Sequence, residues 1–188
     1  MTVSSGLTLI VEKDPKRIIA GRYVVDSIHT RVMFNVVHFG ISKYWGEFYG
    51  PVGSLDIDPT APDRTALSVS VLCGQVKTNS QTLDAELRSA EWFDAERFPN
   101  ITLSGHGLNL LGDNKATFTG DFTLHGVTRP VEFNVEFTGA GTSPFTGQPT
   151  IGFEARATIS RREFGVSAKY PIVGDAVNLI ISAAFDFA

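Results

Sequence analysis

The histidines are the first residues of this chain that could do chemistry, because imidazole serves both as a general base and as a metal ligand. The 188 residues contain four of them. His29 and His38 belong to one alternating segment, and their odd spacing places them on opposite faces of a strand. They therefore cannot share an ion, and we predict no metal site. His38 lies on the apolar face near the strand end, where it could hold the polar head of a ligand.

The other reactive groups have simpler interpretations. The single cysteine, Cys73, excludes an internal disulfide and falls on the apolar side of its segment, which favours a buried small hydrophobe over a reactive thiol. Asp56 and Asp58 precede Pro59, so we expect them to cap a turn in solvent rather than to form a catalytic pair. No nucleophile elbow, phosphate-binding loop, dinucleotide fingerprint or Cys-x-x-Cys pair occurs. We predict no catalytic residue and no cofactor.

Two adjacent arginines allow two interpretations. Arg161 and Arg162 directly follow an alternating apolar segment at 151–159, so they fall near one end of the space that the strands enclose. Guanidinium groups there could bind an anionic head group through paired hydrogen bonds. The Ser-x-x-Glu spacing from Ser160 to Glu163 also predicts a capped turn with both arginines exposed. The residue types leave both interpretations open.

Fourteen phenylalanines mark the elements that must position these groups. Many stand in segments where apolar and polar residues alternate, as in Phe118/Phe122 and Phe133/Phe137. A period of two is typical of strands that turn one face toward a core. We therefore predict strands over 21–26, 29–38, 44–58, 65–73, 101–111, 115–124, 127–138, 151–159 and 177–187, with hairpin turns at 112–114 and 125–126.

One segment alone has a helical period. Leu83, Leu87 and Ala90 recur at i, i+4 and i+7, and residues 78–81 offer a capped start, so we predict a helix from Thr78 to near Trp92. We count about eight main strands among these segments, so the fold class is all-β: an eight-stranded antiparallel lipocalin-like barrel with one α-helix. Such a barrel is filled by side chains or holds one small ligand. Small residues at 155 and 157 favour a cavity.

Composition limits the partners. The formal net charge of −4 and the pI of about 5.5 give no basic surface for nucleic acid. No shift in composition divides the chain, so we expect one domain at 20–188 after an N-terminal extension at 1–19. The apolar run from Leu7 to Val11 is too short for a secretory signal, and no segment approaches the ~20 apolar residues of a membrane span. We therefore expect a cytoplasmic protein without an integral membrane segment.

Several motifs occur in a fixed order along the chain. They are Tyr23-x-x-Asp26-x-x-His29-Thr30, Gly46-x-Phe48-x-x-x-Val52, Leu87-x-Ser89-x-x-Trp92-Phe93-Asp94, Gly120-Asp121-Phe122-Thr123-Leu124-His125-Gly126-Val127-Thr128 and Ser160-Arg161-x-x-Phe164-Gly165. Together they resemble the YceI-like family of lipid-binding, lipocalin-like barrels over residues 20–188. The resemblance implies an elongated barrel whose interior takes a polyisoprenoid, quinone-like or fatty amide chain. It also implies a binding or carrier protein and, in many relatives, a homodimer.

The chain departs from that family at two places. Many relatives carry Arg-Asp-x-His-Leu on the helix, whereas this chain has Leu83-Asp84-Ala85-Glu86-Leu87. Asp84 is thus the polar candidate that the helix retains. Many relatives also carry a secretory signal, which this N-terminus does not resemble, so a cytoplasmic branch of the family fits better.

These observations predict a binding or carrier protein, without catalysis, for a polyisoprenoid, quinone-like, fatty acyl or fatty amide ligand. The expected ligand-binding residues are inward apolar side chains and three polar ones: Phe34, Val36, His38, Phe48, Val69, Asp84, Phe118, Phe122, Phe133, Phe153, Arg161 and Leu179. One alternative is a small enzyme acting on a hydrophobic substrate, with His38 as base and Arg161 as its oxyanion or phosphate partner. Another is a stress-related interaction module with a solidly packed barrel.

Overall fold

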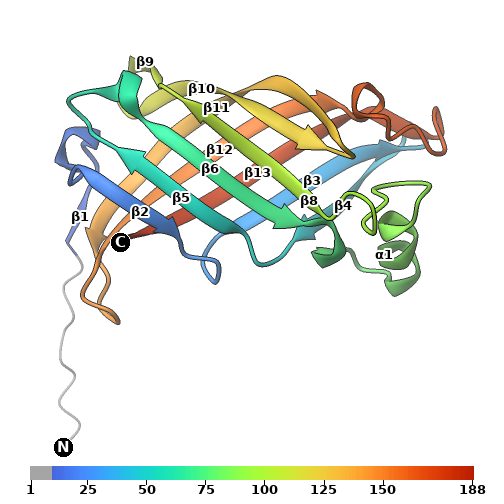
Figure 1. Ribbon diagram of the computed structural model, residues 1–188, viewed down its shortest axis with the longest axis horizontal. Coiled ribbons are helices and arrows are strands. Elements are labelled where there is room, and N and C mark those ends of the chain that lie inside the picture. Colours follow the sequence, from blue (N-terminus) through green and yellow to red (C-terminus); the bar gives the residue numbers. More distant parts are fainter. Residues whose placement is uncertain (1–9) are drawn as a thin grey trace, which may run out of the picture.

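The computed structural model describes residues 10–188 and shows one antiparallel sheet closed into a barrel of eight long strands, with α1 at one end (Figure 1). The predicted all-β barrel is confirmed. Its strands are β1 (Val11–Glu12), β2 (Gly21–Val25), β3 (Arg31–His38), β4 (Ser42–Phe48), β5 (Val52–Ile57), β6 (Ala66–Leu72), β7 (Val76–Lys77), β8 (Asn100–His106), β9 (Asn109–Gly112), β10 (Lys115–Leu124), β11 (Val127–Thr142), β12 (Pro149–Ser160) and β13 (Val173–Phe187). Its helices are α1 (Gln81–Arg88) and the 3-10 turns η1 (Pro15–Arg17), η2 (Pro62–Arg64), η3 (Cys73–Gln75) and η4 (Arg161–Phe164).

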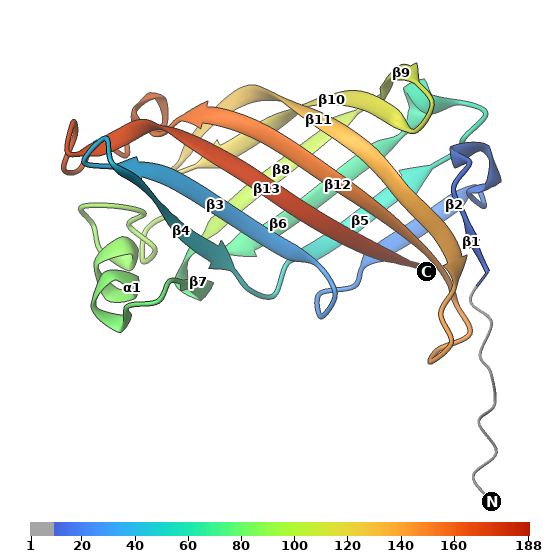
Figure 2. The same cartoon turned by 180° about the vertical axis from the view of Figure 1, so that it is seen from behind.

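Strand β13 closes the barrel. One edge pairs with β12, and the other edge pairs with β3 and then with β2 further along (Figure 2). The predicted strand at 177–187 therefore begins earlier, at Val173, which pairs with His38. Gly174 and Asp175 lie in a register shift between Val173 and Val177, and β13 continues through it.

Two predicted strands are broken, and the prediction of continuous strands at 44–58 and 101–111 is wrong. Gly50, at φ 65°, and Pro51, which has no N–H to donate, separate β4 from β5. After β8, the chain turns at Gly107, which has a φ of 81°, and Leu108 N–H then donates to Pro62 O at 2.9 Å, outside the ladder. The predicted turn at 125–126 is confirmed, with both residues in the left-handed region that a two-residue hairpin requires.

Asp84 fastens α1 to the strand that precedes it. The helix begins after Ser80, whose hydroxyl accepts from Leu83 N–H, so the predicted start at Thr78 is two residues early. Thr78 instead donates to one oxygen of Asp84 from its backbone N–H at 2.6 Å and from its hydroxyl at 2.7 Å. Lys77 lies 3.6 Å from the other carboxylate oxygen. The Asp84 carboxylate therefore anchors α1 to β7.

Two hydrophobic clusters divide the interior. The larger one lies at the α1 end and in the middle of the barrel, where it includes Phe34, Phe48, Trp92 and Phe122. The smaller one fills the opposite end, near the C-terminus in Figure 1, with Ile18, Tyr23, Leu55, Ile57, Phe137, Ile151 and Phe185. That end of the barrel is therefore closed by packed side chains, which we call the end plug.

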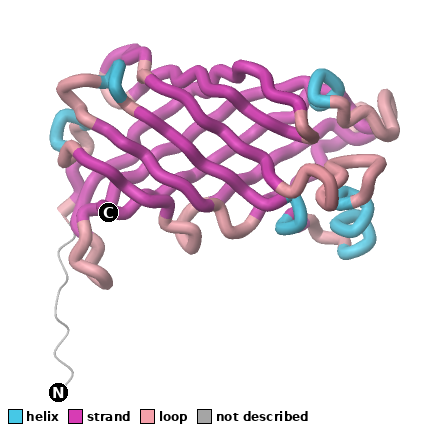
Figure 3. The backbone as a smooth tube through the Cα atoms, in the orientation of Figure 1, coloured by secondary structure: helices cyan, strands magenta, loops and turns pink. Residues whose placement is uncertain are grey.

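The predicted N-terminal extension at 1–19 lies partly outside the described residues, because residues 1–9 are not described. Its described part adds β1, which pairs with β11 at Val11 and Gly141, and the turn η1. Figure 3 shows that the 3-10 turns and α1 lie at the two ends of the barrel. Among the described residues, no helix has the length and apolar character needed to cross a membrane.

Replacing Asp84 by Asn should destabilise the protein in a pH-dependent manner. Burial alone would raise the pKa of Asp84, but the hydrogen bonds from Thr78 hold that pKa below its usual range. The ionised group therefore stabilises the fold above about pH 4, and this contribution is lost as the pH falls through the lowered pKa. We expect Asp84→Asn to lower the free energy of unfolding by about 1–3 kcal/mol at neutral pH.

Urea titrations from pH 3 to pH 7 would measure this difference. Ala85→Asn, at an exposed position of the same helix, serves as the control for helix propensity. An equal loss of stability at both pH extremes would contradict the anchoring role of the carboxylate.

Candidate functional site

Two apolar cavities lie end to end inside the barrel. The inner cavity, toward the end plug, has a volume of about 160 Å³, and the helix-end cavity, beside α1, has a volume of about 220 Å³. Their walls share Val32, Val71, Ile101, Phe122 and Ile181. The barrel therefore holds a hollow along its axis, where a packed core would leave few voids larger than a water molecule.

Small and branched inward residues keep the space open. Ala155 and Ala183 leave room in the wall of the inner cavity. Leu179 and Ile181 on β13 point inward yet are only partly buried, because the hollow faces them. At roughly 10–15 Å³ per water molecule, the inner cavity of about 160 Å³ has room for about 11–16 waters. Its wall offers them almost no hydrogen-bond partner, so the space suits hydrocarbon better than water.

All the sequence-predicted site residues except Asp84 line this hollow. The wall of the inner cavity includes Val69, Phe118, Phe122, Phe133 and Phe153. The wall of the helix-end cavity includes Phe34, Val36, His38, Phe48, Phe122, Arg161 and Leu179. That these side chains bind a ligand stays a prediction. Asp84 lies in neither wall, and because its carboxylate is engaged by Thr78 we no longer include it among the candidates.

The roof of the helix-end cavity was not among the predicted site residues. Leu83 and Leu87 of α1, followed by Trp92 and Phe93, cover this end of the hollow. The ring of Phe93 lies 5.7 Å from that of Phe48 on the barrel wall. The apolar face of the helix was the available signal, because such a face must cover something. Tyr44 and Lys169 also line the cavity; Lys169 lies in a loop without any periodic pattern.

Arg161 is a buried cation at the helix-end cavity. Its side chain donates to the carbonyl oxygens of Gly174, Val166 and Val173, each at 2.8 Å. The guanidinium also lies over the ring of Trp92, 5.4 Å from its centroid. Among the described residues no carboxylate lies within 4.0 Å of it. Burial lowers the pKa of Arg161, and the charge of neighbouring Asp175 partly offsets this.

The predicted capped turn is present, but only one of its arginines is exposed. Ser160 accepts from Glu163 N–H at 3.3 Å and starts η4. Arg162 is exposed and lies over Tyr170, 4.1 Å from the ring centroid. Arg161 is 4% exposed, so the interpretation with both arginines in solvent is wrong for it. Its carbonyl partners explain the burial, since they replace the water that a charged group otherwise needs.

The mouth of the hollow lies beside α1. Among the described residues that line the helix-end cavity, only Lys169 is exposed. Its ammonium pairs with Glu86 of α1, which also accepts from the indole N–H of Trp92 at 3.0 Å. The bond from Lys169 lowers the pKa of Glu86. Across the mouth, His38 is half-buried next to Phe39, with the ring centroids 4.3 Å apart.

The other reactive groups lie away from the hollow's polar end or are inert. Asp58 caps the turn after β5, where it accepts from Thr60 N–H at 2.8 Å, as expected. The expectation is wrong for Asp56, which lies within β5 and pairs with Arg22 of the neighbouring strand at 2.7 Å. Cys73 is buried, and burial raises its pKa to about 11, so it is a thiol at neutral pH. Within residues 10–188, no three His, Cys, Asp or Glu side chains gather in a group that could hold a metal ion.

Comparison with known proteins gives the same family as the motifs. Residues 23–185 match the YceI-like domain. Protein YceI of Salmonella arizonae is 32% identical over 166 residues, which cover 87% of this chain and 86% of that protein. A UPF0312 protein of Ectopseudomonas mendocina is 30% identical over 165 residues, with the same coverage of 87% and 86%.

Solved structures share the barrel. BcnA of Burkholderia cenocepacia superposes with a TM-score of 0.77 at 20% identity, over 85% of this chain and 98% of that chain. The YceI protein of Campylobacter jejuni gives a TM-score of 0.71 at 26% identity, over 81% and 90%. A polyisoprenoid binding domain from Saccharophagus degradans gives 0.62 at 12% identity, over 90% and 100%. By its matching domain, its relatives and its barrel, this chain belongs to the YceI-like family.

Proposed function

We propose that this protein binds one long-chain apolar molecule inside the barrel and carries it, the molecule being a polyisoprenoid, a quinone-like lipid or a fatty acyl or amide chain. The observation that carries the proposal is the pair of apolar cavities that lie end to end in the barrel and share five wall residues. The Saccharophagus domain that shares the fold, described as polyisoprenoid-binding, supports it. A homodimer and a cytoplasmic location stay predictions.

The free energy gained by burying hydrocarbon favours a long-chain apolar ligand. Removing hydrocarbon from water gives about 25 cal/mol per Å², so roughly 300 Å² of buried chain contributes about 7 kcal/mol before ordering costs are subtracted. The cavity walls are already in place, because the strands hold them in a closed ladder. Little of the binding free energy is therefore needed to organise the site.

The polar end of the ligand should lie at the α1 end. Arg161 is a permanent cation in an apolar wall, and three of its five N–H groups are used by the three carbonyl oxygens. His38 and Lys169 line the same cavity. The opposite end presents the apolar end plug. We infer that the hydrocarbon tail points toward the plug and the head toward the mouth.

The enzyme alternative has partial geometric support. His38 and Arg161 both line the helix-end cavity, so they lie at one end of the barrel as that alternative requires. The guanidinium, however, is engaged by backbone carbonyls, and no hydrogen bond from the described residues orients the His38 ring. A catalytic base normally has a partner that fixes its orientation. We therefore favour binding without catalysis. The two cavities inside the barrel also argue against the alternative of a solidly packed interaction module.

Purified protein should contain its ligand. We expect mass spectrometry of an organic-solvent extract to identify a long-chain apolar species in a near-stoichiometric amount. The reason is that the apolar walls offer water almost no hydrogen-bond partners, so a hydrocarbon chain fills the hollow more favourably than water does. The extracted protein should then bind a fluorescent prenyl probe. An empty extract, from a protein that also takes up neither a prenyl nor an acyl probe, would overturn the carrier proposal.

Filling the inner cavity should block binding without weakening the fold. Ala155→Leu adds hydrocarbon to the wall of the hollow, so we expect at least a tenfold loss of prenyl-probe affinity with an unchanged or higher melting temperature. Arg156→Leu places the same new side chain on the outer face of β12 and serves as the matched control. If both variants bound the probe like the unmodified protein, the ligand would not occupy the inner cavity.

A charged head should be recognised at the mouth. We expect Lys169→Met to weaken binding of geranylgeranyl phosphate by about threefold, consistent with a solvent-exposed charge pair worth less than about 1 kcal/mol. Binding of geranylgeraniol, which lacks the charge, should be unaffected. Lys115→Met, at the start of β10, controls for the change in net charge. Equal losses for the two probes would contradict the proposed orientation.

A further inference from the structure

Exposed apolar side chains from two segments lie beside the mouth of the hollow. We call this set the mouth patch; it consists of Val37, Phe39, Ile41, Trp45, Tyr170 and Ile172. Ile41 is 88% exposed and Phe39 is 60% exposed. The two segments that form the patch are joined, because Phe39 N–H donates to Ile172 O at 2.9 Å. Scattered apolar residues on a surface are ordinary, but a gathered set marks an interaction site.

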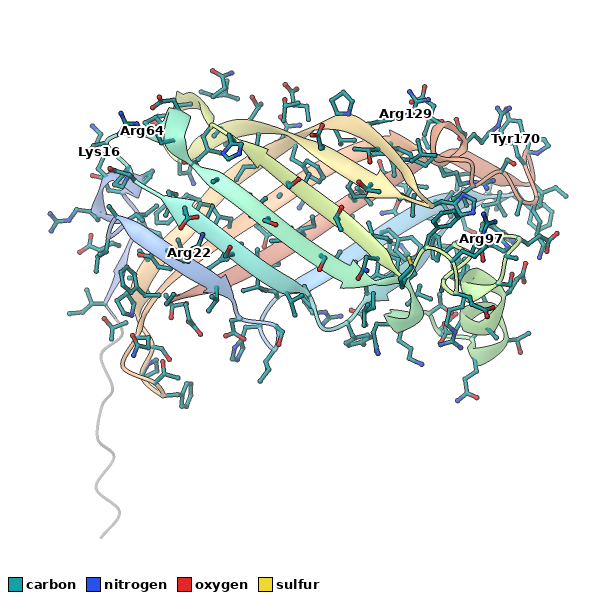
Figure 4. All side chains as sticks on the ribbon, viewed as in Figure 1. Lys16, Arg22, Arg64, Arg97, Arg129 and Tyr170 are labelled. Atoms are coloured by element: carbon teal, nitrogen blue, oxygen red, sulfur yellow. The ribbon has the colours of Figure 1, made fainter. Side chains whose placement is uncertain are left out.

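The patch lies at the far tip of the molecule and continues into the hollow. Figure 4 shows Tyr170 at the α1 end, with Lys16, Arg22 and Arg64 at the other. Along the chain, patch residues adjoin residues of the cavity wall: His38 stands between Val37 and Phe39, and Lys169 precedes Tyr170. A ligand that leaves the mouth therefore meets the patch first.

The charges within the patch are of one sign. Segments 37–45 and 169–173 contain Lys43, Lys169 and His38 but no Asp or Glu, although the whole chain has a net charge of −4. Of the acidic groups packed against them, Glu86 pairs with Lys169. Asp175 accepts from Ser160 and from the N–H of Arg162.

We propose that the mouth patch docks on the surface of an anionic phospholipid bilayer. Aromatic and aliphatic side chains would enter the interface while the lysines face lipid phosphates, as in other interfacial anchors. This inference rests on the proposed function, because a long-chain lipid resides in a bilayer. When the mouth lies on the bilayer, the hydrocarbon chain of the ligand can pass directly from the membrane into the hollow. The cost of exposing that chain to water is then avoided.

A second copy of this chain fits the patch less well. In a two-fold dimer, the same surface meets itself. Each copy would then bring Lys43, for which no ion pair is found among the described residues, into a desolvated interface with no acidic group of the patch to pair with, which disfavours association. A bilayer that contains anionic lipid supplies the opposite charge.

Vesicle flotation tests the proposal with the full-length protein. We expect binding to vesicles of phosphatidylcholine mixed with phosphatidylglycerol, and weaker binding to phosphatidylcholine alone. The double variant Phe39→Ser/Ile41→Ser should bind roughly tenfold more weakly or worse, since it removes the two most exposed patch side chains. Leu110→Ser/Leu111→Ser, with exposures of 60% and 59% on β9, is the matched control and should bind normally.

The lysine contribution is tested separately. Lys43→Gln should weaken binding to the anionic vesicles about fivefold, as expected for one basic residue near such a surface. It should not change binding to phosphatidylcholine. A Lys43→Gln variant that binds both kinds of vesicle like the unmodified protein would overturn the electrostatic part of the proposal.

Uptake of a prenyl probe added from ethanol separates docking from carriage. A patch variant that takes up the probe normally but no longer floats supports docking. An unmodified protein that takes up the probe but never floats overturns docking and leaves the proposed function standing. If sedimentation instead shows a dimer that Phe39→Ser/Ile41→Ser dissociates, the patch is a contact between two copies and the proposal fails.

Discussion

The closure of the sheet by β13 is the constraint on which the other features depend. β13, the last strand, pairs with β12 along one edge and with the early strands β2 and β3 along the other. This pairing joins the C-terminal strands to the N-terminal ones and closes the ring. A sheet closed in this way commits every second side chain of its strands to the interior. Once the ring is closed, the sizes of those inward side chains decide whether the barrel is solid or hollow.

The interior differs along its length for that reason. At the end plug, bulky residues such as Tyr23, Phe137 and Ile151 meet and fill the space. In the inner cavity, Ala155 and Ala183 leave room in the wall, and the helix-end cavity is covered from outside the strands by α1 and Trp92. Arg161 then binds the carbonyl oxygens of Val166 in the loop before β13 and of Val173 and Gly174 at the start of β13. Polar groups are thus concentrated at the one end where the hollow meets solvent.

Alternation in the sequence was enough to predict the barrel and the faces of its strands, because burial on one side imposes a period of two. It failed where another interaction overrides that period. The alternating run at 177–187 starts later than β13 does, because a register shift between Val173 and Val177 interrupts the alternation. Asp84 looked like a ligand contact, and only the position of Thr78 shows that its carboxylate is occupied. Lys169 and the mouth patch come together through loops, whose conformation no periodic pattern encodes.

The end plug limits the length of ligand that the barrel can enclose. Between Val173 and Phe185, β13 rises about 40 Å along its own direction, and the hollow ends where Phe185 joins the packed rings. The depth of the hollow therefore limits the length of hydrocarbon chain that it can enclose. Each added methylene contributes roughly 0.8 kcal/mol while it can still be enclosed, and further units protrude with no such gain. Affinity therefore climbs with chain length to a plateau, and the rings at the closed end determine where the plateau begins.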